Sequence, residues 1–256
     1  MIEFRNFSKK YNHNDEYAVK DISFIAEDCS ITVIVGENGA GKSTILKAAS
    51  LVHYPSKGNV FISGNKNGQI FDSLEYADCA KKYVSFVSEN TKLQPDLYVS
   101  EYLKQASSLY NYSKHNLNNS LNSSSRKKLQ EIVQMCELDS VLEKKVKALS
   151  NGYKKRLLLA LALIPDAKNI VLDEPASALD PIQKNKFRVI IKNLAKTKTV
   201  LYSTHSLQDI SEFNCKILVL SDGKIIADTS EKDLLEKTGA SNLEKAFLKI
   251  TKKAKS

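Results

Sequence analysis

The sequence contains the stretch Gly36-Glu37-Asn38-Gly39-Ala40-Gly41-Lys42-Ser43-Thr44, which has the pattern GxxxxGK(S/T). An apolar run at residues 31–35 precedes this stretch, and a helix-like run at residues 43–53 follows it. Glycines let the backbone wrap around a phosphate with several N–H groups pointing inward, and the next helix presents its positive end to the anion. We therefore expect a phosphate-binding loop between a buried strand and a helix.

Two residues at the end of this loop have individual roles. We expect the Lys42 ammonium to contact the β- and γ-phosphates of a nucleotide and the Ser43 hydroxyl to bind Mg²⁺. The loop predicts a nucleotide-binding protein, and it leaves kinases, GTPases and several classes of ATPase open.

A second apolar run, residues 169–172, ends in the acids Asp173 and Glu174. Such a strand is expected beside the strand of the loop, so that Asp173 emerges at the carboxyl edge of the sheet, where open α/β sheets bind ligands. We expect Asp173 to hold Mg²⁺, directly or through water, and Glu174 to orient or deprotonate the attacking water. A glutamate directly after the magnesium-binding acid indicates hydrolysis rather than phosphoryl transfer to a second substrate.

The composition is that of a globular protein. The chain has 256 residues, of which 42% are hydrophobic and 26% charged, so disordered and fibrous classes are excluded. The most apolar run, residues 157–164, is far shorter than the roughly 20 residues that cross a bilayer. The N-terminus lacks the apolar region of a signal peptide, so we expect a cytoplasmic protein.

The cysteines and the net charge further limit the classes of protein to which the chain can belong. The four cysteines are far apart in the sequence and have no histidine at ligand spacing, which argues against a zinc site and a disulfide framework. The formal charge of +9 indicates an acidic partner, which can be nucleic acid, anionic lipid or a nucleotide phosphate.

Short apolar strands alternate with helical stretches along the chain. This order predicts a layered α/β fold with a largely parallel sheet. Residues 97–164 read mainly as helix and are long enough to form a subdomain. Within them, ten of the fifteen residues 111–125 are Asn or Ser. This composition favours a solvated connection between two helices, with a regulatory or partner-binding loop as the alternative.

The pentapeptide Leu149-Ser150-Asn151-Gly152-Tyr153 adds a third motif. Together with the two motifs above, it makes nearly the whole chain resemble the nucleotide-binding subunit of an ABC transporter, whose signature is LSGGQ. The sequence departs from that signature at Asn151, where the family has Gly, and at Tyr153, where it has Gln. Ser150 is also a good N-cap for the following helix. The resemblance implies that Ser150 and Gly152 contact the γ-phosphate of ATP bound by the opposite protomer of a head-to-tail dimer.

Further motifs of the family have counterparts here. The tetrapeptide Ser177-Ala178-Leu179-Asp180 is similar to the D-loop, which contacts the site of the partner protomer. His205 follows an apolar run and resembles the switch histidine that contacts the γ-phosphate. Tyr11 stands where the family has the aromatic residue that stacks on adenine, and Tyr17 is a nearby competitor for this role.

Glu89 occupies the position at which the family has the glutamine of the Q-loop. A carboxylate still offers an oxygen to Mg²⁺, but it cannot donate a hydrogen bond unless it is protonated. The resemblance therefore implies that Mg²⁺ is held by Ser43, Glu89 and Asp173, and that Glu89 alters the rate of hydrolysis or its coupling. A shift of the alignment to Ser88 or Asn90 is the alternative.

The resemblance also implies an architecture. We expect an α/β fold made of a P-loop NTPase core with a mostly parallel sheet, an N-terminal antiparallel β subdomain and an inserted α-helical subdomain. The whole chain, residues 1–256, is expected to form one ABC ATPase domain. Its expected parts are a catalytic core with the β subdomain at 1–88 and 166–228, a helical subdomain with the signature motif at 89–165, and a C-terminal helical tail at 229–256.

The implied function is ATP hydrolysis that powers transport by a separate membrane permease. ATP and Mg²⁺ are the implied cofactors, and Lys42, Glu174 and His205 the catalytic residues. The protein would lie on the cytoplasmic face of the cell membrane as a homodimer, or as a heterodimer with a second ABC ATPase. The single cassette and short tail resemble the bacterial export branch of the family. An ABC ATPase acting on nucleic acid or ribosomes is the main alternative, although we expect no direct binding of nucleic acid; a P-loop kinase is the third reading.

Overall fold

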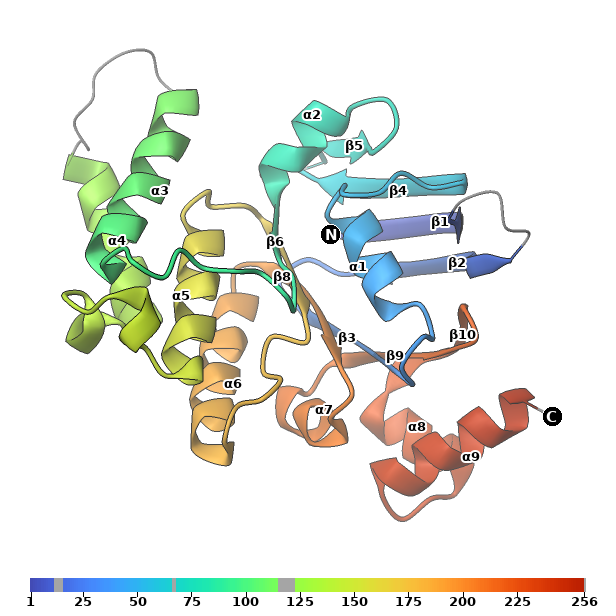
Figure 1. Ribbon diagram of the computed structural model, residues 1–256. Helices are drawn as coiled ribbons and strands as arrows, with labels where there is room; N and C mark the ends of the chain where they lie inside the picture. Colours follow the sequence, from blue (N-terminus) through green and yellow to red (C-terminus); the bar gives the residue numbers. More distant parts are fainter. Residues whose placement is uncertain (12–15, 66–67, 115–122, 256) are drawn as a thin grey trace.

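The computed structural model describes residues 1–11, 16–65, 68–114 and 123–255. Figure 1 shows two sheets with helices around them. The first sheet is antiparallel, with strand order β2-β1-β4-β5. Its strands are β1 (Ile2–Lys10), β2 (Tyr17–Ala26), β4 (Lys57–Ser63) and β5 (Ile70–Asp72).

The second sheet has the order β10-β9-β3-β8-β7-β6 and is parallel except for β10, which pairs antiparallel with β9. Its strands are β3 (Ile31–Gly36), β6 (Val84–Val87), β7 (Asn169–Asp173), β8 (Thr199–Thr204), β9 (Lys216–Ser221) and β10 (Lys224–Ser230). Every residue of β3, β7 and β8 is buried. Continuous apolar runs of this kind are expected in parallel strands covered on both faces.

Helix α1 (Lys42–Ala49) packs between the two sheets. Its Ile45 and Leu46 belong to a core cluster that also contains Phe4 of β1 and Val171 of β7. The helix predicted for residues 43–53 is shorter in the structure. It ends because Leu51 takes a left-handed conformation with φ of 58°, which turns the chain away from the helix axis.

A second core cluster lies on the other face of the parallel sheet. It joins Leu159 of α5 (Asn151–Leu163), Phe187 of α6 (Pro181–Ala195) and Ile210 of α7 (Leu207–Phe213). The remaining helical elements are α2 (Ala77–Ala80), η1 (Lys81–Tyr83), α3 (Val99–Lys114), α4 (Ser123–Met135), η2 (Asp139–Val141), η3 (Val146–Ala148), α8 (Glu231–Thr238) and α9 (Leu243–Lys255).

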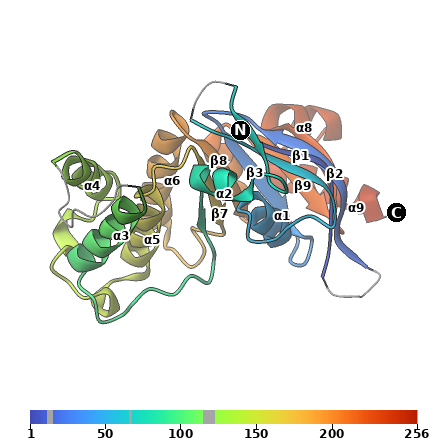
Figure 2. The same cartoon turned by 90° about the horizontal axis from the view of Figure 1, so that it is seen from above.

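Helices α3, α4 and α5 lie at one end of the molecule, away from the antiparallel sheet, in both Figure 1 and Figure 2. They are inserted in the chain between β6 and β7. This arrangement confirms the predicted α/β class, with a mostly parallel sheet, an N-terminal antiparallel sheet and an inserted helical part. The centre of the Asn/Ser-rich segment, residues 115–122, lies outside the described residues.

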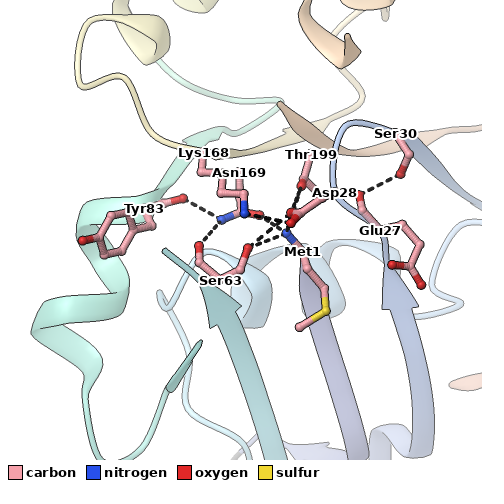
Figure 3. A network of polar contacts seen from close by, with 9 residues as sticks. All are labelled: Met1, Glu27, Asp28, Ser30, Ser63, Tyr83, Lys168, Asn169 and Thr199. Atoms are coloured by element: carbon pink, nitrogen blue, oxygen red, sulfur yellow. Dashed lines mark hydrogen bonds and ion pairs between the residues drawn. The ribbon is translucent and has the colours of Figure 1, made fainter. Parts of the chain in front are cut away.

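A polar network joins the two sheets at the starting ends of the parallel strands (Figure 3). Asp28, which follows β2, accepts hydrogen bonds from Lys168 Nζ at 2.8 Å and from Thr199 Oγ1 at 3.1 Å, and it pairs with the α-amino group of Met1. That amino group also donates to Asn169 Oδ1 at 3.0 Å. The network therefore ties β1 and β2 to the starts of β7 and β8.

The structure also bears on membrane crossing and on disulfide bonds. None of the helices in the described parts of the chain is both long and apolar enough to cross a membrane. All four cysteines carry free thiols, and burial raises the pKa of Cys136 and of Cys215 to about 12.

Candidate active site

A cavity of about 690 Å³ lies where the strands of the parallel sheet end. Residues 36–39 and 41–44 of the predicted phosphate-binding loop form one wall. The cavity is also lined by Glu89 after β6, Glu174 after β7 and His205 after β8. The sheet thus brings together four segments that are far apart in the sequence.

The loop is held tightly by its neighbours. A Cβ atom at Gly36 would lie 2.4 Å from the carbonyl oxygen of Leu220 in β9, and one at Gly41 would lie 2.8 Å from the carbonyl oxygen of Ala18 in β2. Gly41 also has φ of 105°. Ala40 is buried, and its carbonyl oxygen accepts a hydrogen bond from Gly223 N at 3.1 Å. Glycine is therefore required at Gly36 and Gly41 by close backbone packing.

Lys42 begins α1 and is 7% exposed. Its Nζ atom donates to the carbonyl oxygens of Gly36 at 2.9 Å and Glu37 at 3.2 Å. The ammonium is thereby directed along the loop rather than away from it. A positive charge so placed, beside the first turn of a helix, suits the binding of a phosphate chain.

The two predicted acids differ in their surroundings. Asp173 is 3% exposed and accepts a hydrogen bond from Ser203 Oγ at 2.8 Å, while the same hydroxyl accepts one from Glu174 N at 2.9 Å. Glu174 lines the cavity, and its Oε2 atom lies 2.8 Å from Nδ1 of His205. A carboxylate and an imidazole that are in contact in this cavity form a pair that can hold and deprotonate a water molecule.

Oxygen donors for a metal ion gather at the same edge of the sheet. Ser43 and Glu89 line the cavity, and Asp173 comes directly before Glu174. Hydroxyl and carboxylate oxygens are the ligands that Mg²⁺ prefers. Within the described residues, no group of three or more His, Cys, Asp or Glu side chains could hold a metal ion by itself. One hydroxyl and two carboxylates suit a Mg²⁺ ion, which commonly takes its further ligands from phosphate and water.

Tyr11 contacts the loop from outside. Its hydroxyl donates to Thr44 Oγ1 at 3.2 Å, and its ring meets that of His53 edge-on with centroids 5.3 Å apart. Tyr17 instead has the ammonium group of Lys10 4.5 Å from its ring centroid. Of the two candidates for the adenine contact, the structure brings Tyr11 next to the loop.

The signature and D-loop residues do not line this cavity. Ser150 is the N-cap of α5 and accepts from Tyr153 N at 3.5 Å, and Gly152 packs against the side chain of Gln183. Asp180 is the N-cap of α6 and accepts from Gln183 N at 3.0 Å. The remaining D-loop residues, Ser177, Ala178 and Leu179, lie just before it, and Ser177 and Ala178 line a second cavity of about 720 Å³.

Sequence reasoning missed several residues at the site. Ala18, Leu207 and Phe247 also line the cavity. Phe247 comes from α9, more than 200 residues after the loop, and an aromatic residue on an amphipathic helix gives no signal of which cavity it reaches. Lys155 was missed as well, although it is the second residue after the signature motif and donates to the backbone oxygen of Glu89 at 3.4 Å.

Comparison with known proteins identifies the family to which the chain belongs. The family model described as ABC transporter matches residues 19–177. The chain is 30% identical over 236 residues to the Nod factor export ATP-binding protein I of Burkholderia orbicola, covering 92% of this chain and 72% of that protein. It is also 30% identical over 222 residues to the energy-coupling factor transporter ATP-binding protein EcfA2 of Ligilactobacillus salivarius, covering 86% and 74%.

Solved structures agree with this match. The dimeric structure of a bacterial ABC transporter cassette is similar with a TM-score of 0.74 and 25% identity, over 90% of this chain and 98% of that one. The dimer of that cassette in a post-hydrolysis state with ADP and Pi gives a TM-score of 0.73 and 26% identity over the same shares. The predicted resemblance and the predicted ATPase class are confirmed: the chain belongs to the ABC transporter family and is one of its ATP-hydrolysing cassettes.

Proposed function

We propose that this cassette powers transport by a separate membrane permease, through ATP-driven closure of a head-to-tail dimer. The contact of Glu174 with His205 carries the proposal, because a carboxylate base and an imidazole in the same cavity as the phosphate-binding loop suit the activation of a water molecule next to the γ-phosphate of ATP. Glu174 activates the attacking water, and His205 positions it and contacts the γ-phosphate. Lys42 neutralises charge that develops on the β- and γ-phosphates.

The rest of the site binds the nucleotide. Tyr11 contacts the adenine, and the backbone of the loop surrounds the phosphates. Ser43, Asp173 and Glu89 hold Mg²⁺, which supplies charge neutralisation to the phosphates when bound. The nucleotide-binding loop consists of Gly36, Glu37, Asn38, Gly39, Ala40, Gly41, Lys42, Ser43 and Thr44.

A second copy or a paralogue completes each site. Ser150 and Gly152 start a helix whose N–H groups and dipole suit a γ-phosphate, yet they lie outside the cavity of their own chain. Ala178 and Asp180 of the D-loop are exposed. These features support a head-to-tail arrangement in which the signature motif of one protomer closes the cavity of the other.

The second cavity supports a permease contact. It lies between residues 89–95 and α5 and is lined by Lys92, Lys147, Lys154 and Lys155 beside the apolar Leu93 and Leu158. We infer that a cytoplasmic segment of the membrane subunit docks here, so that the cassette is peripheral on the cytoplasmic face and its positive charge faces anionic lipid. On this proposal, residues 1–88 and 166–228 are the catalytic core with the β subdomain, 89–165 the helical subdomain and 229–256 the tail.

Replacing Glu174 with Gln tests the catalytic assignment. The variant is expected to lose about 10²- to 10⁴-fold in kcat while still binding ATP, and to elute as a dimer with ATP on a sizing column. Continued hydrolysis without a dimer would contradict the assignment.

A second measurement tests the partner. The net charge of +9 favours nucleic acid or ribosomes as the alternative target. Detergent extraction of a tagged chain is expected to recover an associated membrane subunit containing transmembrane helices. Recovery of RNA or ribosomes in its place would favour the alternative function.

A further inference from the structure

Lys155 connects α5 to the segment that follows β6. It lies on the first turns of α5 and is half-buried. Its Nζ atom donates a hydrogen bond to the backbone oxygen of Glu89 at 3.4 Å. The ammonium group therefore stands beside the residue that lines both cavities, since Glu89 is shared by the nucleotide cavity and by the cavity next to α5.

Three carboxylates act electrostatically on this ammonium group. Burial lowers the pKa of Lys155, and the charges of Glu89, Glu174 and Asp173 act in the opposite direction, in that order of strength. These are the acids of the catalytic edge of the sheet. A partly desolvated lysine beside them contributes a fixed positive charge that water screens weakly.

We propose that Lys155 is a positioning residue that weakens the Mg²⁺ affinity of the cassette. The negative charges of Glu89, Asp173 and Glu174 attract both its ammonium group and the metal ion, so the charge of the lysine offsets part of the attraction on the ion. This inference rests on the proposed Mg²⁺ site. The positive charge of Lys155 also attracts the phosphates of the nucleotide. Lys155 therefore strengthens nucleotide binding in the absence of metal and reduces the further gain in nucleotide affinity that Mg²⁺ provides. A merely structural lysine would not produce these two effects of opposite sign.

The experiment uses the full chain and a fluorescent ATP analogue as the probe. Its binding is measured in EDTA and then during titration with free Mg²⁺, for the wild type and for Lys155→Gln, Lys155→Arg and Lys154→Gln. Lys154 is the matched control, because it is the neighbouring lysine on α5 and lines the same second cavity, whereas the hydrogen bond to Glu89 comes from Lys155. Thermal unfolding of each variant checks that it is folded.

Lys155→Gln is expected to lower the Mg²⁺ concentration for half-maximal binding about fivefold and to weaken binding in EDTA, by the loss of one nearby unit charge. Lys155→Arg and Lys154→Gln are expected to stay within about twofold of the wild type, and the effect of Lys155→Gln shrinks in high salt. A Mg²⁺ requirement that is unchanged or raised in Lys155→Gln overturns the inference, and so does a Lys155→Arg variant that behaves like Lys155→Gln.

Asp173→Asn separates this inference from the proposed function. The variant is expected to raise the Mg²⁺ requirement at least tenfold, because it removes a charged ligand. If it does so while Lys155→Gln leaves the requirement unchanged, only the role of Lys155 is overturned. If the wild type binds the probe equally well with and without Mg²⁺, the proposed metal site and the inference both fail.

Discussion

The Nδ1 atom of His205 lies 2.8 Å from Oε2 of Glu174. The contact follows from the sheet, because Asp173 at the end of β7 is in register with Ser203 near the end of β8. The side chain of His205 is 65% exposed, whereas that of Glu174 is 12% exposed. The pair is therefore covered by protein at Glu174 and open to solvent at His205.

His205→Ala removes one member of this pair. Glu174 and the loop stay in place, so nucleotide binding is expected to remain within about twofold, while kcat falls about 10²-fold through loss of the positioned water and the γ-phosphate contact. Steady-state ATPase assays and nucleotide titration give the two quantities. A variant with unchanged kcat would remove His205 from the reaction.

Glu89→Gln introduces the glutamine that the family resemblance implies for this position. The amide keeps an oxygen for Mg²⁺, adds an N–H donor and removes a negative charge from the phosphate cavity. We expect kcat to rise severalfold and the Mg²⁺ requirement to rise slightly. Glu75→Gln, an exposed acid away from the cavity, is the control. If Glu89→Gln leaves Mg²⁺ affinity, ATPase rate and transport coupling unchanged, the special role of Glu89 is refuted.

Asp209→Asn breaks a buried ion pair close to His205 in the sequence. Asp209 Oδ1 lies 2.6 Å from Arg188 Nη2, and Oδ2 accepts from Thr204 Oγ1 at 2.8 Å, directly before His205. Leaving Arg188 unpaired is expected to cost about 3–5 kcal/mol of unfolding free energy. The control is Glu212→Gln in the same helix, whose exposed pair with Lys192 is worth less than about 1 kcal/mol. Chemical denaturation that shows equal losses for both variants would contradict this reading.

Asp28→Asn tests the network that joins the sheets. Burial alone would raise the pKa of Asp28, but hydrogen bonds from Lys168, the α-amino group and Thr199 outweigh it and hold that pKa well below the usual value. A depressed folded pKa contributes stability that is complete above the ordinary pKa of about 4 and is lost as the pH falls further. We expect the variant to lose about 1 kcal/mol at neutral pH.

The pH dependence separates this network from a general charge effect. As the pH falls from about 4 to about 2, the unfolding free energies of wild type and Asp28→Asn should approach each other, because the unfolded wild-type chain binds a proton on this carboxyl before the folded protein does. Glu27→Gln, at the neighbouring exposed acid, is expected to show neither the loss nor the convergence. A constant difference between Asp28→Asn and wild type down to pH 2 would count against the network.

Phe247→Ala opens the wall that α9 contributes to the nucleotide cavity. Phe247 lines the cavity together with Leu207 and His205, so the loss of its ring is expected to weaken nucleotide binding about three- to tenfold by admitting water. Leu248→Ala, at the next residue but 49% exposed, should leave binding unchanged. Equal nucleotide affinities for both variants would show that Phe247 does not contact the ligand.

The sequence predicted the parts of the site that are local in the chain. The loop, the acids after β7 and His205 after β8 were identified because each follows a buried run, and the carboxyl ends of parallel strands meet at one edge. β10 gave no such signal, since none of its residues is fully buried and its apolar stretch is short.

Contacts between distant segments could not be predicted in this way. Phe247 reaches the cavity because α9 packs against β9 and β10, and Asp28 meets Thr199 because two sheets are placed side by side. Both depend on the angles at which whole elements pack, which a motif of a few residues does not encode. Lys155 lies between these two cases. The signature motif just before it was recognised, but the direction of its side chain was not predicted.

The close packing of Gly36 on Leu220 and of Gly41 on Ala18 has a consequence for genetic work. Alanine alleles at these two glycines would disturb the framework of the protein as well as its ligand, so a null phenotype would not reveal which was lost. Glu174→Gln keeps the shape of its side chain and changes only its charge. A cell that carries this allele would show whether it requires ATP hydrolysis by the cassette or only the folded protein.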